Sequence, residues 1–225
     1  ATAPTNVTVS PQGGTVVANT LNGTNTHVDF AADITAGEAT GGKAEFYVNG
    51  VLVATDNSIA AGDTSVTATT SDGDPTTAEV QAAIASGGVV SVKLYDAAGN
   101  VVSADGPTLV RDLEPPSRPS APTQYLDDVG AILSSSSTAR VTDDARPGLL
   151  VGTNLGDTPS LYVDGQRVAA TYDPAAGTLT PDAPLAEGTR SLSYTLTDAA
   201  GNESVRSAAL TLALDLTAPV LDLDS

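Results

Sequence analysis

Residues 191–202 read SLSYTLTDAAGN, and this stretch decides how the second half of the chain folds. Apolar and hydroxyl side chains alternate through its first part, which predicts a β-strand with one buried face and with the hydroxyls in water. The buried positions are Leu192, Tyr194 and Leu196. The following DAAGN predicts a turn, because glycine and asparagine tolerate positive φ and an aspartate side chain can cap its own turn. We expect the chain to close a hairpin and return through residues 210–214.

The same turn sequence occurs earlier, at residues 96–100, so the chain contains a tandem repeat with an offset of 102 residues. The first copy also follows an alternating strand, with Val90, Val92 and Leu94 on its buried face. Each copy is followed by an acidic segment that ends in proline, DLEPP at 112–116 and DLTAP at 215–219. An offset of this size is typical of one small domain per repeat. The sequence therefore predicts domains at 1–115 and 116–225, cut from a longer array.

Two further turns support an all-β fold. Residues 46–51 read FYVNGV and residues 161–166 read LYVDGQ, so each places Asn-Gly or Asp-Gly between extended runs. That arrangement favours a two-residue type I′ turn. Many short strands with regular turns predict an all-β sandwich in each domain. The exception is residues 75–86, where an initial proline, good helix formers and a following glycine predict a short inserted helix in the first domain.

The chain is strongly acidic, with 27 acidic residues against 9 basic ones and a formal net charge of -18. This charge argues against nucleic acid and against anionic membrane surfaces as partners, and it favours cations. Among the acids, 21 are aspartate and only 6 are glutamate. Aspartate is the short carboxylate favoured in calcium-binding loops, although an acidic surface can also simply keep a protein soluble. Cysteine is absent, which excludes disulfides and cysteine-ligated zinc.

Enzyme chemistry has little support in the sequence. His27 is the only histidine, and it lies in a stretch expected to be a strand. The chain contains no Gly-x-Ser-x-Gly elbow, no His-Glu-x-x-His pair and no phosphate-binding glycine loop. We therefore expect a protein that is not an enzyme. No apolar run approaches the roughly 20 residues that a membrane-spanning helix requires.

Six fragments follow one another along the second half of the chain. They are DDVG at 127–130, TDDARP at 142–147, YVDG at 162–165, LAEGT at 185–189, TDAAGN at 197–202 and DLTAP at 215–219. In this order they resemble the bacterial immunoglobulin-like extender repeats of giant, type I-secreted RTX adhesins. The resemblance covers nearly all of residues 117–219, whereas residues 1–115 share only the Asn-Gly hairpin, the DAAGN turn and the acidic linker. It implies tandem immunoglobulin-like β-sandwiches that hold a distal ligand-binding region away from the cell. It also implies a secreted, cell-surface monomer whose partners are neighbouring repeats, stiffened by Ca²⁺ at the domain junctions.

Immunoglobulin-like connectivity predicts where the cations bind. The loop that carries Asp198 should face the linker that precedes its own domain, so we expect a junction site at Asp112, Glu114 and Asp198. Weaker candidates at the same junction are Asp157, Asp72 and Asp74. Incomplete copies are expected at the outer ends, formed by Asp96 at one end and by Asp143, Asp144 and Asp215 at the other. Asp96 and Asp198 have a second reading as simple turn caps, which is compatible with metal ligation.

Two other functions stay open at this point. The first domain, with its inserted helix, is an alternative candidate for a ligand-binding or glycan-binding module of the adhesin. The chain is also consistent with a stalk from a surface layer or from an enzyme.

Overall fold

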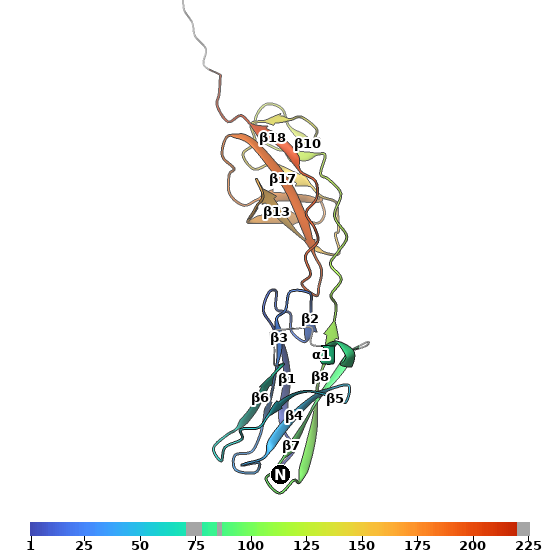
Figure 1. Ribbon diagram of the computed structural model, residues 1–225. Coiled ribbons are helices and arrows are strands. Elements are labelled where there is room, and N and C mark those ends of the chain that lie inside the picture. Colours follow the sequence, from blue (N-terminus) through green and yellow to red (C-terminus); the bar gives the residue numbers. More distant parts are fainter. Residues whose placement is uncertain (71–77, 85–86, 220–225) are drawn as a thin grey trace, which may run out of the picture. The chain divides into compact units, whose positions relative to one another are not determined.

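The computed structural model describes residues 1–70, 78–84 and 87–219. The chain divides into two compact units, which are Ala1–Glu114 with Ala200–Asn202, and Pro115–Ala199 with Glu203–Ser225. Figure 1 labels the helix and many of their strands. Within the described ranges, no helix has the length and apolar character needed to span a membrane.

The first unit consists of two β-sheets. The three-stranded sheet has the order β1 (Thr5–Gln12), β3 (His27–Asp33), β6 (Ser65–Thr69). The five-stranded sheet has the order β2 (Thr20–Leu21), β8 (Val101–Arg111), β7 (Gly88–Tyr95), β4 (Lys43–Val48), β5 (Val51–Asp56). Neighbouring strands are antiparallel, except that β2 and β8 run parallel. The short helix α1 (Ala78–Ala83) precedes β7.

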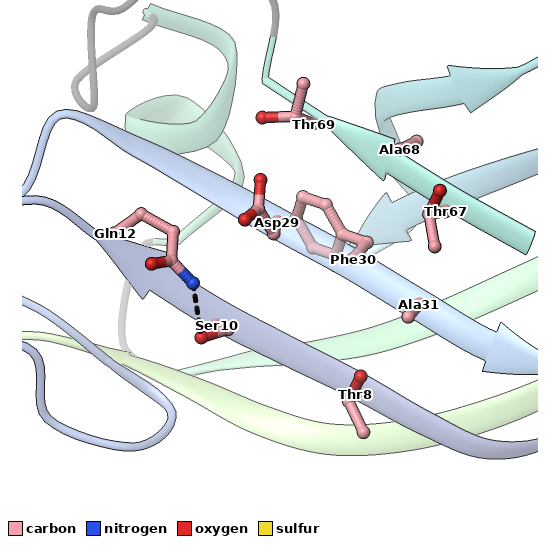
Figure 2. Close-up of a pocket in the computed structure, with 9 residues that line it drawn as sticks. All are labelled: Thr8, Ser10, Gln12, Asp29, Phe30, Ala31, Thr67, Ala68 and Thr69. Carbon is pink, nitrogen blue, oxygen red and sulfur yellow. Dashed lines mark hydrogen bonds between the residues drawn. The ribbon is translucent and has the colours of Figure 1, made fainter.

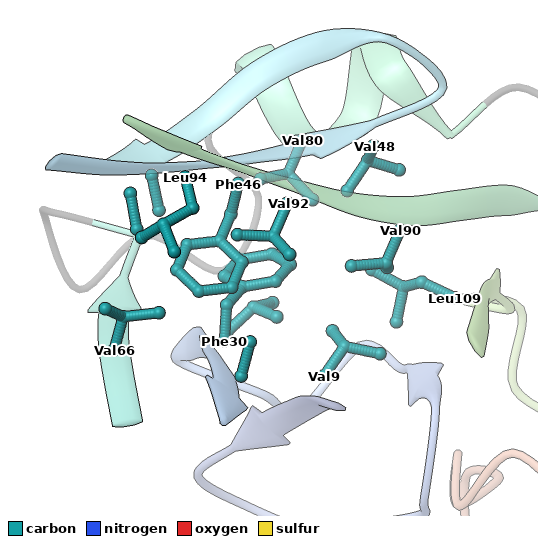
Figure 3. Packing of buried hydrophobic residues seen from close by; sticks show 14 of the residues in the cluster. Val9, Phe30, Phe46, Val48, Val66, Val80, Val90, Val92, Leu94 and Leu109 are labelled. Carbon is teal, nitrogen blue, oxygen red and sulfur yellow. The ribbon is translucent and has the colours of Figure 1, made fainter. Parts of the chain in front are cut away.

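The core of the first unit lies between these two sheets (Figure 3). Phe30 of β3 and Phe46 of β4 stack with their ring centroids 5.6 Å apart, so the two largest side chains of the cluster join the sheets. Val80 of α1 is fully buried, which means that the helix packs onto the same core. The predicted helix at 75–86 is therefore observed over Ala78–Ala83, while residues 75–77 and 85–86 lie outside the described part of the chain.

The second unit also has two sheets, each with five strands. One has the order β10 (Ser134–Ser137), β9 (Tyr125–Asp127), β12 (Gly148–Leu150), β16 (Thr178–Pro181), β15 (Ala170–Asp173). The other has the order β11 (Val141–Thr142), β18 (Leu210–Leu214), β17 (Gly188–Thr197), β13 (Thr158–Val163), β14 (Gln166–Val168). The core between them is built around buried Tyr125, Tyr194 and several leucines. The prediction of an all-β sandwich is confirmed.

The second copy of the DAAGN turn reverses the chain as predicted, and Thr197 and Glu203 on its two sides form an isolated antiparallel bridge. β17 ends at Thr197, but β18 begins only at Leu210. In the intervening segment, Ser204 N donates to Leu196 O at 2.8 Å, while Ser204 Oγ accepts from Leu196 N at 2.9 Å. Ser207 pairs in the same way with Tyr194. The serine hydroxyls thus supply the acceptors that a regular strand would provide with its carbonyls.

The alternation predicted that the hydroxyl face of β17 lies in water. The segment after β17 covers this face instead. Ser193 and Thr195 are buried, and Thr195 Oγ1 donates a 2.6 Å hydrogen bond to Glu203 Oε1. The strand therefore has cover on both faces. The predicted burial of Leu192 and Tyr194 is confirmed, whereas Leu196, predicted to be buried with them, is only partly buried.

Both predicted type I′ turns have the expected backbone. Asn49 and Gly50 have φ of 48° and 80°, and Asp164 and Gly165 have φ of 50° and 83°. The first turn joins β4 to β5 and the second joins β13 to β14. Positive φ at both central residues matches the right-handed twist of the strands, which is why Asn-Gly and Asp-Gly predict this hairpin so well.

Gly50 offers a direct test of this backbone requirement. A Cβ at Gly50 or at Gly62 would meet no atom within 4 Å, but only Gly50 has positive φ. We expect Gly50→Ala to destabilise the first unit by about 1–2 kcal/mol, the cost of left-handed backbone for a residue with a Cβ. Gly62→Ala should be neutral or slightly stabilising. Urea denaturation measures both, and equal stabilities for the two variants would contradict the assignment.

Candidate functional site

Carboxylates of the second unit gather where β9 and β11 end. Asp127 is the last residue of β9, and Thr142 ends β11 two positions before Asp144. Thr142 Oγ1 donates to Asp127 Oδ2 at 2.8 Å and accepts from Asp144 N at 3.1 Å. One hydroxyl therefore joins two acidic residues that belong to different parts of the chain. Asp127 is 6% exposed and Asp144 is 2% exposed, so both carboxylates are removed from water.

Each of these carboxylates keeps one buried oxygen without a hydrogen-bond partner among the described residues. The two atoms are Asp127 Oδ1 and Asp144 Oδ2. The remaining oxygen of Asp144, Oδ1, accepts a 2.7 Å hydrogen bond from Arg146 N. A buried charge without full compensation is costly, and most buried polar atoms in native proteins have a partner. The pair of orphaned oxygens therefore marks the strongest candidate for a bound cation in the described chain.

The electrostatic environment of Asp144 favours the same conclusion. Burial is the main effect that raises the pKa of Asp144, and the nearby carboxylates of Asp128, Asp127 and Asp143 raise it further, although the hydrogen bond from Arg146 N opposes them. The raised pKa means that the ionised form is disfavoured here. A cation at this position would reverse the penalty, because it would attract each of these carboxylates.

Exposed acids surround the buried pair. Thr142 pairs with Leu214 in the parallel ladder of β11 and β18, so Asp143 and Asp215 follow at the same end of the sheet. Both are exposed. Together with Asp127 they line a hollow of about 540 Å³. The grouping of Asp143, Asp144 and Asp215 expected from the sequence is thus placed at one end of the second unit, and the structure adds Asp127 to it.

Asp127 was not among the ligands predicted from the sequence. It lies two positions after the fully buried Tyr125 in β9, so both side chains belong to the inward-facing positions of the strand. An acidic residue at an inward position is the signal that could have identified it.

The other predicted ligands lie elsewhere, each within its own unit. Asp112 and Glu114 follow β8 in the first unit, where Asp112 Oδ1 accepts from Glu114 N at 3.2 Å. Asp157 and Asp198 belong to the second unit and flank the paired residues Thr158 and Thr197, so they lie at the same end of that sheet. Asp72 and Asp74 lie outside the described residues.

Asp96 has the turn-capping role that the sequence offered as its second reading. Its Oδ1 accepts from Ala98 N and Asn100 N, both at 2.9 Å, and its Oδ2 accepts from Asn100 Nδ2 at 2.8 Å. These hydrogen bonds, led by the one from the Asn100 side chain, lower the pKa of Asp96. Both of its oxygens therefore have partners within the turn.

Across residues 1–70, 78–84 and 87–219, no three His, Cys, Asp or Glu side chains converge closely enough to hold a metal ion by themselves. A cation at the buried pair therefore needs further oxygen ligands, either from the backbone, from water or from exposed acids that reorient.

Comparison with known proteins assigns most of the second unit to a known domain family. Residues 123–216 match the family model described as bacterial Ig-like domain. This match and the two packed sheets make the fold an immunoglobulin-like β-sandwich. The matched range contains the whole carboxylate end, from Asp127 to Asp215. The comparison with curated proteins found no match.

Several solved structures are similar over most of the chain. Fibronectin(III)-like modules of Clostridium thermocellum CbhA share 12% identity, with 92% of this chain and 93% of that one covered and a TM-score of 0.44. A 1.5-MDa bacterial ice-binding adhesin shares 18% identity, with coverages of 96% and 67% and a TM-score of 0.45. A Ca²⁺-stabilised adhesin of an Antarctic bacterium shares 19% identity, with coverages of 95% and 50% and a TM-score of 0.46. The chain thus spans half of the Antarctic adhesin structure, and similarities of this size carry no argument about activity.

The bridging role of Thr142 can be tested by substitution. Thr142→Val keeps the side-chain shape but removes the hydroxyl, which leaves Asp127 Oδ2 and Asp144 N without their partner. We expect a loss of about 1.5–3 kcal/mol in the stability of the second unit, because hydrogen bonds to charged groups have this value. Thr142→Ser, which keeps the hydroxyl, is the matched control. Chemical denaturation that shows equal losses for the two variants would contradict the bridge.

Proposed function

We propose that the chain is a non-catalytic extension segment of a bacterial cell-surface adhesin, in which immunoglobulin-like repeats in series project a distal ligand-binding region. The similarity of residues 123–216 to bacterial Ig-like domains supports this proposal, as does the resemblance of the same region to RTX adhesin repeats. The observation that carries it is the pair of orphaned buried carboxylate oxygens at one end of the second unit. In this proposal, Ca²⁺ at such ends stiffens the series.

The residues present fit calcium better than a softer metal. Calcium binds six to eight oxygen ligands and tolerates irregular geometry. Asp127 and Asp144 supply buried carboxylate oxygens, whereas Asp128, Asp143 and Asp215 are exposed. When bound, the ion supplies positive charge that compensates the buried pair. The exposed acids add ligands that the buried pair cannot provide alone.

An exposed apolar surface beside these carboxylates supports neighbouring repeats of the same polypeptide as partners. Ile132 is 81% exposed, and Val141 and Leu216 are also exposed. These three side chains line the same hollow as Asp127, Asp143 and Asp215. Large apolar side chains gathered in water are typical of an interaction surface. Here the surface adjoins the residues that follow β18, which suits docking of a following module.

The remaining calcium ligands stay predictions within this proposal. The junction grouping of Asp112, Glu114 and Asp198, with Asp157, Asp72 and Asp74, is the one that the resemblance to RTX adhesin repeats suggests. Asp96 is a candidate for the opposite outer end. Secretion to the bacterial surface and a monomeric state belong to the same proposal.

Calcium binding at the buried pair has a clear thermodynamic signature. Excess Ca²⁺ at about 100 times its Kd should stabilise the second unit by about 2.7 kcal/mol. Asp127→Asn and Asp144→Asn should lose most of this gain, and Asp144→Asn should be at least as stable as the unaltered chain in chelator, because it removes a buried charge. Thermal unfolding with and without chelator measures the gain, with Asp105→Asn, at an exposed carboxylate of the first unit, as the control. An equal calcium response in the unaltered chain and in both variants of the pair would remove this site from the proposal.

The extension role itself is tested by small-angle scattering of the full chain. If calcium stiffens the series, the unaltered chain in calcium should have a larger maximum dimension and a narrower range of conformations than in chelator. Asp144→Asn should weaken that response only if its site contributes to stiffening. Identical scattering profiles with and without calcium would contradict the mechanical role, even if the ion binds.

A further inference from the structure

A second hollow lies in the first unit, on the outward face of the three-stranded sheet (Figure 2). Its volume is about 540 Å³. It is lined by Thr8, Ser10 and Gln12 of β1, by Asp29, Phe30 and Ala31 of β3, and by Thr67, Ala68 and Thr69 of β6. None of these residues belongs to the carboxylate end of the second unit. The hollow is therefore separate from the candidate cation site.

The strand register explains its shape. Ala31 of the central strand pairs with Thr8 on one side and with Thr67 on the other. A methyl group between two longer side chains leaves a depression. The next outward row is Ser10, Asp29 and Thr69, which closes one end of the depression with polar groups. Phe30 lies between the rows but is 1% exposed, since its ring belongs to the core.

The lining offers hydrogen-bond donors and acceptors that the protein leaves largely unused. Among the described residues, neither the Thr8 hydroxyl nor the Thr67 hydroxyl has a hydrogen-bond partner. Gln12 Nε2 donates to Ser10 Oγ at 2.8 Å, as Figure 2 shows, so its second N–H and its carbonyl stay available. Asp29 is about half exposed, and its nearest ionic partner is His27 Nε2 at 3.7 Å.

We propose that this hollow binds a neutral carbohydrate of one or a few sugar units. Sugar hydroxyls both donate and accept, which matches a lining of hydroxyls, one amide and one carboxylate. Asp29 accepts from sugar hydroxyls, Gln12 and the threonines donate and accept, and Ala31 contacts an apolar C–H face. The volume lies in the usual range for small-molecule sites, about 300–1,000 Å³.

Charge selects a neutral ligand over an acidic one. No lysine or arginine lines the hollow, and its only carboxylate would repel an anionic sugar. The whole chain has a formal net charge of -18, so an acidic polymer would be repelled at longer range as well. The proposed binding goes beyond the extension role and does not depend on calcium.

The test begins with the full chain on an array of neutral and acidic oligosaccharides, with calcium or with chelator. Each neutral oligosaccharide that binds is then titrated by calorimetry. We expect saturable binding that persists in chelator, at least about tenfold weaker binding for Asp29→Ala, in line with a hydrogen bond to a charged group, and no binding for Ala31→Phe, which fills the depression.

Ser103→Phe is the matched control, because it places the same ring on an exposed position of β8 in the other sheet of the same unit. Thermal unfolding verifies that both phenylalanine variants fold. Absence of binding to every neutral oligosaccharide, preference for acidic ones, or unchanged affinity of Ala31→Phe would each overturn the proposal. Carbohydrate binding that persists in chelator would not depend on calcium, so failure of the calcium proposal and failure of the carbohydrate proposal can be told apart.

Discussion

The burial of Asp127 and Asp144 around one threonine hydroxyl is the constraint on which the end of the second unit depends. Thr142 satisfies one oxygen of Asp127 and the backbone N–H of Asp144, but it leaves a buried oxygen on each carboxylate unpartnered among the described residues. The rest of the core is made of leucine, valine and a few tyrosines, which do not solvate charge. A group that compensates the unpaired oxygens would approach from the exposed side, where further acids and an apolar surface lie.

Local rules account for what the sequence predicted correctly in the fold. The turns at Asn49-Gly50 and at Asp164-Gly165 depend only on their own backbone, and alternation places Val90, Val92 and Leu94 inside without knowledge of any partner strand. The segment after β17 could not be predicted in this way. Ser204 and Ser207 imitate strand pairing with their side chains, and this becomes evident only when their partners Leu196 and Tyr194 are in place.

In the candidate site, too, some features follow from local sequence and others depend on tertiary packing. Aspartates in loops are visible in the sequence, so Asp143, Asp144 and Asp215 could be grouped from their positions along the chain. Asp127 could not be ranked with them, because its importance comes from burial, which depends on the packing of β9 against the opposite sheet. Asp96 shows the reverse case: an equivalent motif drew attention to it, yet its own turn satisfies both oxygens. Counting acids identifies the region, whereas hydrogen-bond partners decide which buried carboxylate oxygens are left without a partner.

A proton is the natural competitor of a cation at the buried pair, and the raised pKa of Asp144 favours it. A protonated carboxyl, however, carries an O–H donor that itself requires an acceptor. Asp127 Oδ1 and Asp144 Oδ2 have neither donor nor acceptor partners among the described residues, so a proton on one leaves the other oxygen unsatisfied unless the two share it. A calcium ion, in the proposed role, would need no such sharing, because its charge would attract both carboxylates together with Asp128, Asp143 and Asp215. The exposed acids then become favourable neighbours, whereas beside a proton they only continue to repel one another.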